Sequence, residues 1–69
     1  FIFLNLPESG TVQLEVYDFI GRRMTATNNE YYSQGLHTMR IPGIENWSTG
    51  AYVYRIYING NMETGKLQR

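Results

Sequence analysis

Alternation of apolar and polar residues at a spacing of two is the feature that most constrains the fold. In segment 11–17, Val12, Leu14 and Val16 fall on one side and mostly polar residues on the other. Segment 51–58 carries the strongest signal, because β-branched and aromatic residues fill most of its positions. Its expected inward residues are Tyr52, Tyr54, Ile56 and Ile58. No segment shows the helical spacing of about 3.6 residues, so the pattern predicts an all-β chain.

Turn residues separate these segments at short intervals. Asn59 and Gly60 are typical of a two-residue hairpin turn with positive φ at both positions. Asp18 and Gly21 bound a short hairpin loop, in which the Asp18 carboxylate is expected to accept backbone N–H groups two or three residues on. Gly10 is expected to supply positive φ after the first strand. The weaker predicted strands are 1–5, 22–27, 36–41 and 64–68. Together these signals predict a small antiparallel, immunoglobulin-like β-sandwich of about six to seven strands.

Length and composition narrow the class of protein. The chain has 69 residues, no cysteine and zero formal net charge. We interpret residues 1–69 as a single domain, since this length allows one core, and the chain looks like an excised piece. Dispersed arginines and lysine disfavour nucleic acid as a partner, and the absence of a run of roughly 20 apolar residues disfavours direct membrane insertion. The irregular segment 41–47 is expected to cover an open end of the core with Ile44 and Trp47.

The sequence contains no recognisable catalytic constellation. His37 is the only histidine, and its place on an alternating face favours a partly buried side chain hydrogen-bonded to backbone. The six acidic residues are spread over different turns and strands, so neither a metal cluster nor a glycosidase-like carboxylate pair is predicted. We therefore predict that the chain is not an enzyme and that it binds no metal or cofactor.

The order of the turn and strand signals resembles one family, the C-terminal sorting domain of type IX secretion substrates in Bacteroidetes. The first half of the likeness consists of segment 6–10, segment 12–18 with its Val-x-Leu-x-Val-Tyr-Asp pattern, and segment 20–22. The second half consists of Gly35 with His37, segment 49–56, Gly60, and Lys66 with Leu67. Each fragment alone is weak evidence of the family. The resemblance rests on the occurrence of all of them, in the family's order, over most of the chain.

The resemblance implies a non-catalytic sorting signal that follows a passenger protein. Its implied partners are the outer-membrane secretion machinery, a C-terminal-signal peptidase and the upstream passenger domain. The implied location is the periplasm in transit, then the cell surface or the extracellular space. Carried over by position, the family's glycine-tyrosine motif falls on Gly50 and Tyr52, and its turn motif on Asp18 and Gly21. Its terminal strand falls on Lys66 and Leu67.

A physical mechanism is compatible with this function. An edge strand has unpaired backbone groups that a partner strand can capture, while alternate side chains set specificity. We expect the final strand, with Lys66 and Arg69 exposed, to belong to the recognised surface, and the same edge offers a possible dimer contact. For Gly50 and Tyr52 we favour structural roles, in a turn and in the core, over direct contact with a receptor.

Two other functions remain open at the level of sequence. Tyr31, Tyr32 and Trp47 can stack on sugar rings, which would make the chain a carbohydrate- or protein-binding accessory module of a secreted enzyme. Tyrosines on outer strand faces also pair across a sheet without binding anything, and this is the simpler reading of such residues. The last possibility is a structural spacer domain.

Overall fold

The computed structural model describes all 69 residues and contains seven strands and one short 3-10 helix. The strands are β1 (Ile2–Leu6), β2 (Gly10–Asp18), β3 (Arg23–Ala26), β4 (Glu30–Tyr32), β5 (Gly35–Met39), β6 (Ala51–Ile58) and β7 (Asn61–Gln68). The 3-10 helix η1 (Ile44–Asn46) lies between β5 and β6. No helix is long and apolar enough to cross a bilayer.

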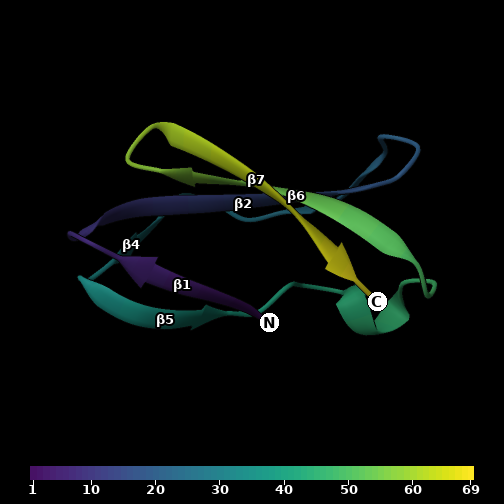
Figure 1. Cartoon of the computed structure of the whole chain (residues 1–69), viewed down its shortest axis with the longest axis horizontal. Coiled ribbons are helices and arrows are strands. Elements are labelled where there is room, and N and C mark those ends of the chain that lie inside the picture. Colours follow the sequence, from purple (N-terminus) through teal and green to yellow (C-terminus); the bar gives the residue numbers. More distant parts are fainter.

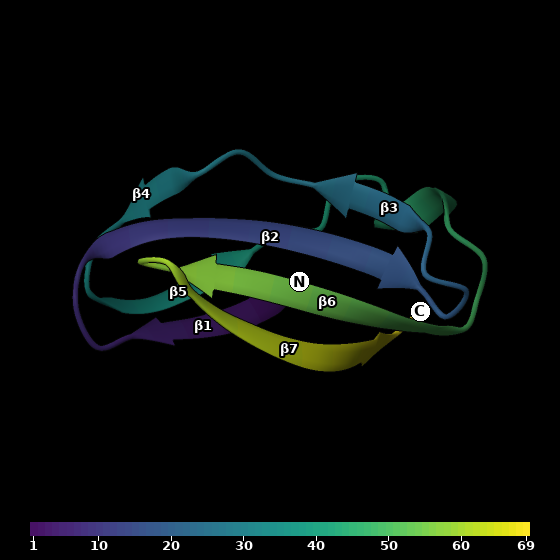
Figure 2. The same cartoon turned by 90° about the horizontal axis from the view of Figure 1, so that it is seen from above.

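The strands form two antiparallel sheets packed face to face. The larger sheet has the order β3-β2-β6-β7, with β4 paired to the start of β2, and the smaller sheet consists of β1 and β5 (Figure 1). Seen from above, β2 and β6 lie along the long axis, and β7 lies on the opposite side of β6 from β2 (Figure 2). This arrangement confirms the predicted small antiparallel β-sandwich.

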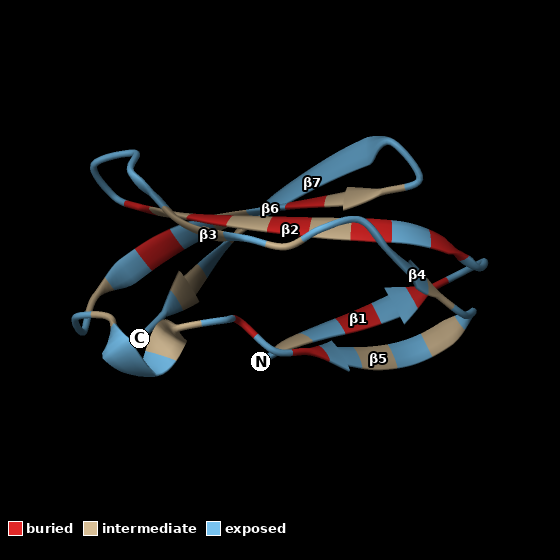
Figure 3. Cartoon of the chain, turned by 180° about the vertical axis from the view of Figure 1, so that it is seen from behind, coloured by how far each residue is buried: buried red, intermediate tan, exposed pale blue.

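The core lies between the two sheets and follows the two-residue alternation. Val12, Leu14 and Val16 of β2 are fully buried, and Leu4 and Leu6 of β1 face them from the smaller sheet. Buried and exposed residues alternate along both layers (Figure 3). In β6 the inward prediction is confirmed, because two of its members are buried and two are half-buried against the core: Tyr52 and Ile56, then Tyr54 and Ile58.

Helix η1 and the residue after it close one end of the sandwich, as expected for segment 41–47. Ile44 and Trp47 are half-buried against the core. The Trp47 ring lies 5.0 Å from the Tyr52 ring, centroid to centroid, at an interplanar angle of 40°. Two large aromatic side chains therefore seal an end that the short strands leave open.

The Asn59-Gly60 turn has the predicted conformation, with φ of 50° at Asn59 and 84° at Gly60. The Asn59 side chain also accepts a hydrogen bond from the backbone N–H of Thr11 at 3.0 Å. The expectation of positive φ at Gly10 is wrong. Gly10 is the first residue of β2, and a Cβ atom there would overlap the end of the Asn59 side chain, which would have to shift to admit a larger residue.

Strand β6 has the predicted bounds, the ends of β1, β2, β3 and β5 differ from the prediction by one or two residues, and two differences are larger. Strand β4 was not predicted, because three residues are too few to show an alternation; it forms by pairing with residues 10–12 of β2. Strand β7 begins at Asn61, three residues before the predicted start, because the tight turn at 59–60 places Asn61 directly opposite Ile58. The long-range ladder, and not the local pattern, determines both boundaries.

Candidate functional site

The hairpin between β2 and β3 is organised by a buried carboxylate. Asp18 is 7% exposed, and its Oδ1 accepts the backbone N–H groups of Ile20 at 3.0 Å and Arg22 at 2.8 Å. Its Oδ2 accepts the Arg22 Nε–H at 2.7 Å. The predicted acceptor role of Asp18 is therefore confirmed for the N–H two residues on, whereas the second N–H lies four residues on and not three. Gly21 has a φ of 97° that suits glycine in the turn.

Opposing effects act on the Asp18 carboxyl. Burial raises the pKa, while the backbone N–H and the guanidinium of Arg22 and the N–H of Ile20 stabilise the ionised form and outweigh it. The pKa of Asp18 therefore lies below its usual value. The carboxylate is ionised at neutral pH and is occupied entirely by the turn that it holds together.

The end of β7 is joined to the start of β6 and to η1 through the last residue. The backbone N–H of Arg69 donates to the Gly50 carbonyl at 2.9 Å, and the Gly50 N–H donates back to Arg69 at 3.3 Å. The Arg69 Nε–H donates to the Ile44 carbonyl at 2.7 Å, and a terminal nitrogen donates to the Glu45 carbonyl at 3.0 Å. Arg69 is exposed, yet its guanidinium holds the 3-10 helix in place.

Gly50 and Tyr52 have structural contacts. Gly50 has a φ of 155°, a conformation that side-chain-bearing residues rarely adopt, although open space surrounds the position of a Cβ atom. Tyr52 is 6% exposed, and its hydroxyl donates to the Ser48 carbonyl at 2.6 Å. This bond fixes the loop that leads from Trp47 into β6.

Strand β7 is the open edge of the larger sheet, since it pairs only with β6. Because Gly50 and Arg69 form a hydrogen-bonded pair, the bonded positions of β7 alternate from there along the register. The intervening residues therefore direct their backbone N–H and C=O groups to the free edge: Met62, Thr64, Lys66 and Gln68. Lys66 is exposed and lies opposite Val53 on the outer face, whereas Leu67 is half-buried against the core.

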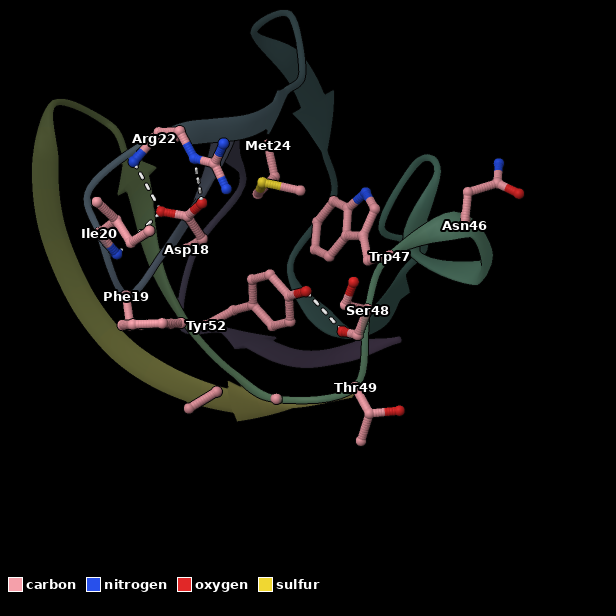
Figure 4. A pocket seen from close by; sticks show the side chains of 12 residues that line it. Asp18, Phe19, Ile20, Arg22, Met24, Asn46, Trp47, Ser48, Thr49 and Tyr52 are labelled. Atoms are coloured by element: carbon pink, nitrogen blue, oxygen red, sulfur yellow. Dashed lines mark hydrogen bonds and ion pairs between the residues drawn. The ribbon is translucent and has the colours of Figure 1, made fainter.

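A cleft of about 380 Å³ lies between the β2–β3 hairpin and the segment from Asn46 to Tyr52. In Figure 4, Met24, Trp47 and Tyr52 lie around it, with the Tyr52 hydroxyl directed toward Ser48, and Asp18 with Arg22 lies at one side. A second hollow, of about 360 Å³, lies on the other side of the same hairpin. Its lining includes Tyr17, Val53 and Arg55.

The outer face of the larger sheet carries a polar aromatic cluster. The hydroxyls of Tyr17 and Tyr57 both donate to Glu15 Oε1 at 3.1 Å, and the guanidinium carbon of Arg55 lies 5.1 Å from the Tyr17 ring centroid. Burial and the hydrogen bond to the Glu15 carboxylate raise the pKa of Tyr17. Tyr17 is therefore neutral at physiological pH and acts as a hydrogen-bond donor within the sheet.

The remaining candidate residues lie apart from one another. The His37 ring is half-buried, with Nε2 at 2.6 Å from the Ser33 carbonyl oxygen, which confirms the expected backbone bond. Tyr31 and Tyr32 lie on β4 beside the start of β2, while Trp47 packs near the end of β2. The three aromatics therefore form no continuous platform. No group of three or more histidine, aspartate or glutamate side chains is close enough to hold a metal ion.

The sequence singled out Asp18 and Gly21 as a turn and Gly50 and Tyr52 as a motif, and the structure brings these residues to the same end of the molecule, apart from Gly21 all of them in the lining of the inner cleft. The sequence analysis expected Arg69 to be exposed on the recognised strand and missed its bonds to η1. A terminal arginine has no pattern that reveals its carbonyl partners, which lie 24 and 25 residues away.

No family model matches the chain, and no match was found among curated proteins or among solved structures.

Proposed function

We propose that the chain is a non-catalytic sorting domain that directs an attached passenger through an outer-membrane type IX export machinery, for release or attachment at the cell surface. The proposal rests on the ordered resemblance of its motifs to that family and on one structural observation. The last strand, β7, is the outermost strand of the larger sheet, and its free edge is open to a partner strand.

The geometry of β7 supports recognition by strand addition. Four residues direct backbone donors and acceptors outward, and the strand spans eight residues. The outward groups belong to a strand that is anchored at both ends: the tight turn at 59–60 starts it, and the Gly50–Arg69 pair ends it. A partner strand therefore meets an edge that is already extended, so little ordering entropy is lost on binding.

The other motif residues support this edge without facing the partner. Gly50 and Arg69 join the end of β7 to β6, Tyr52 lies in the core, and Leu67 packs inward. In the proposed function these residues keep the terminal strand in place. Lys66 is the basic side chain exposed on the recognised strand and sets specificity by its charge.

The test uses a reporter fused upstream of the chain in a bacterium that has a type IX system, with export to the periplasm supplied separately. Lys66→Pro removes an outward N–H from β7 without breaking a bond to β6. The residue before it is Gly65, which tolerates the conformational restriction that proline imposes. Lys66→Ala is the matched control, because it removes the charge and keeps the N–H.

We expect secretion of the unaltered fusion, reduced secretion of Lys66→Ala, and retention of Lys66→Pro in the periplasm, with similar thermal unfolding for all three. Unimpaired secretion of the proline variant would refute edge capture. Failure of the unaltered chain to direct any reporter out of the periplasm would refute the sorting function. Truncation of residues 66–69 is a poorer test, because it also removes the packing of Leu67 and the hydrogen bonds of Arg69.

A further inference from the structure

The tip of the β2–β3 hairpin exposes two large apolar side chains at a place where turns are usually polar. Phe19 is 82% exposed and Ile20 is 67% exposed. Together they expose apolar surface to water, which polar residues at the same two positions would not do. Such adjacent exposure on a short loop is typical of a surface that a partner covers.

The backbone beneath these two side chains is held in one conformation. Besides the three hydrogen bonds to the Asp18 carboxylate, the Asp18 N–H donates to the Arg22 carbonyl at 2.9 Å, and the Gly21 N–H donates to the Asp18 carbonyl at 3.0 Å. A loop with five internal hydrogen bonds loses little conformational entropy when a partner covers it. Phe19 and Ile20 are therefore preorganised for contact.

A hollow lies on each side of this tip. The inner one is walled by Met24, Trp47 and Tyr52, and the outer one by Tyr17 and Val53. Both are also lined by Phe19 and Ile20. The exposed pair thus forms a ridge between two concave sites, each with an aromatic wall against which an apolar side chain can pack.

Each hollow is lined by one arginine and by the same carboxylate, Asp18. Arg22 lines the inner hollow and Arg55 the outer one, and Asp18 is the only carboxylate in either lining. The Asp18 oxygens already accept three hydrogen bonds. Arg55 makes no ion pair, and Arg22 uses only Nε for Asp18, which leaves its terminal nitrogens to other acceptors.

We propose that the hairpin ridge, defined as Phe19 and Ile20 with the two flanking hollows, is a second docking surface, separate from the β7 edge. Its partner is a protein segment that carries apolar side chains flanked by carboxylates. The apolar groups cover the ridge and enter the hollows, and the carboxylates pair with Arg22 and Arg55. A lipid surface can also contact exposed phenylalanine and arginine, but it is smooth and does not fill two concave sites of this size.

The probe is a synthetic amidated peptide, Gly-Asp-Leu-Phe-Asp-Gly, and its charge-reversed counterpart is Gly-Lys-Leu-Phe-Lys-Gly. Trp47 is the only tryptophan and lines the inner hollow, so its fluorescence reports occupancy directly. Amide chemical shifts of residues 18–22 and 48–53 locate the peptide. We expect both signals to change with the acidic peptide and to change little with the basic one.

Phe19→Ser is expected to weaken binding of the acidic peptide by about tenfold or more. The matched control is Phe3→Ser, because Phe3 is also 82% exposed but lies on the outer face of β1. Arg55→Gln should weaken binding by about two- to fivefold and reduce the preference for acidic over basic peptide. Thermal unfolding of each variant checks that the fold is retained.

Three outcomes would overturn the proposal: absence of any response to the acidic peptide, equal binding of both peptides, or equal losses in Phe19→Ser and Phe3→Ser. Vesicles of mixed phosphatidylcholine and phosphatidylglycerol form a further arm. Vesicle binding that requires Phe19, in the absence of peptide binding, would assign the ridge to a membrane surface. None of these results depends on secretion, so they are independent of the test of β7.

Discussion

Replacement of Gly65 by alanine is expected to destabilise the chain through a single neighbour. Gly65 lies directly opposite Tyr54 in the β6–β7 ladder, and the Tyr54 ring lies over it. A Cβ atom at position 65 would overlap the outer atoms of that ring. Covering of a strand glycine by a cross-strand aromatic ring is a known device for keeping glycine in an edge strand.

The size of the effect follows from two opposed contributions. Alanine is favoured over glycine within a strand by about 0.5–1 kcal/mol. Against this, the Tyr54 ring is half-buried against the core, so displacing it incurs an overpacking cost of about 1–3 kcal/mol. We expect Gly65→Ala to lower the free energy of unfolding by about 1–2 kcal/mol, a large share of the total for 69 residues, which is about 3–10 kcal/mol.

The sign should reverse when the ring is absent. Tyr54→Leu removes the ring atoms that cover position 65 and keeps an apolar side chain toward the core, so Gly65→Ala in that background should stabilise by about 0.5–1 kcal/mol. Urea unfolding of the four proteins measures the coupling as a double-mutant cycle. Equal effects of Gly65→Ala in both backgrounds would show that the ring does not determine the choice of glycine.

Four further outcomes follow from individual residues. Leu14→Ala at the fully buried centre of β2 should cost about 3–5 kcal/mol in urea unfolding, and a loss below about 1 kcal/mol would contradict the close-packed core. Folding lowers the pKa of Asp18, so the ionised carboxylate stabilises the fold above about pH 4, and this contribution is lost as the pH falls through the folded pKa. The free energy of unfolding should therefore fall less steeply with decreasing pH in Asp18→Asn than in the unaltered chain. Parallel curves of unfolding free energy against pH for the two proteins would refute this. Arg69→Gln should release η1 and increase acrylamide quenching of Trp47, and unchanged quenching would show that other contacts hold the helix. If the β7 edge forms a dimer, sedimentation should show a concentration-dependent mass for Lys66→Ala and a monomer for Lys66→Pro, whereas equal masses would exclude that edge.

Local patterns predicted the strands that lie in the centre of the larger sheet. The observed bounds of β6 match segment 51–58, and the alternation in β2 placed Val12, Leu14 and Val16 inward. These two strands are long and have their apolar residues on one face, so the hydrophobic effect alone specifies their register relative to the core. The tight turn at Asn59 was equally predictable, because its conformation restricts the residue type.

Features that depend on long-range pairing were not predictable in the same way. Strand β4 has three residues and forms only because β2 is long enough to accept two partners on one side, β4 at its start and β3 at its end. The division into a five-stranded and a two-stranded sheet likewise depends on which strands pair with each other. The alternation of apolar and polar residues does not predict these pairings. The same limit applies to Gly10, where a Cβ atom would overlap the side chain of Asn59 from a distant part of the chain.

The candidate site shows the same division more sharply. Asp18 and its turn were predictable because every partner of the carboxylate lies within four residues. The link from Arg69 to η1 was not, because its two carbonyl partners lie 24 and 25 residues away; η1 leads directly into Trp47, which lines the inner hollow. The two proposed surfaces thus share a support: Arg69 ends the β7 edge with its backbone and holds one wall of the hairpin cleft with its guanidinium. A partner strand that adds to the free edge of β7 leaves the Gly50–Arg69 pair in place, so both surfaces can be occupied in the same folded molecule.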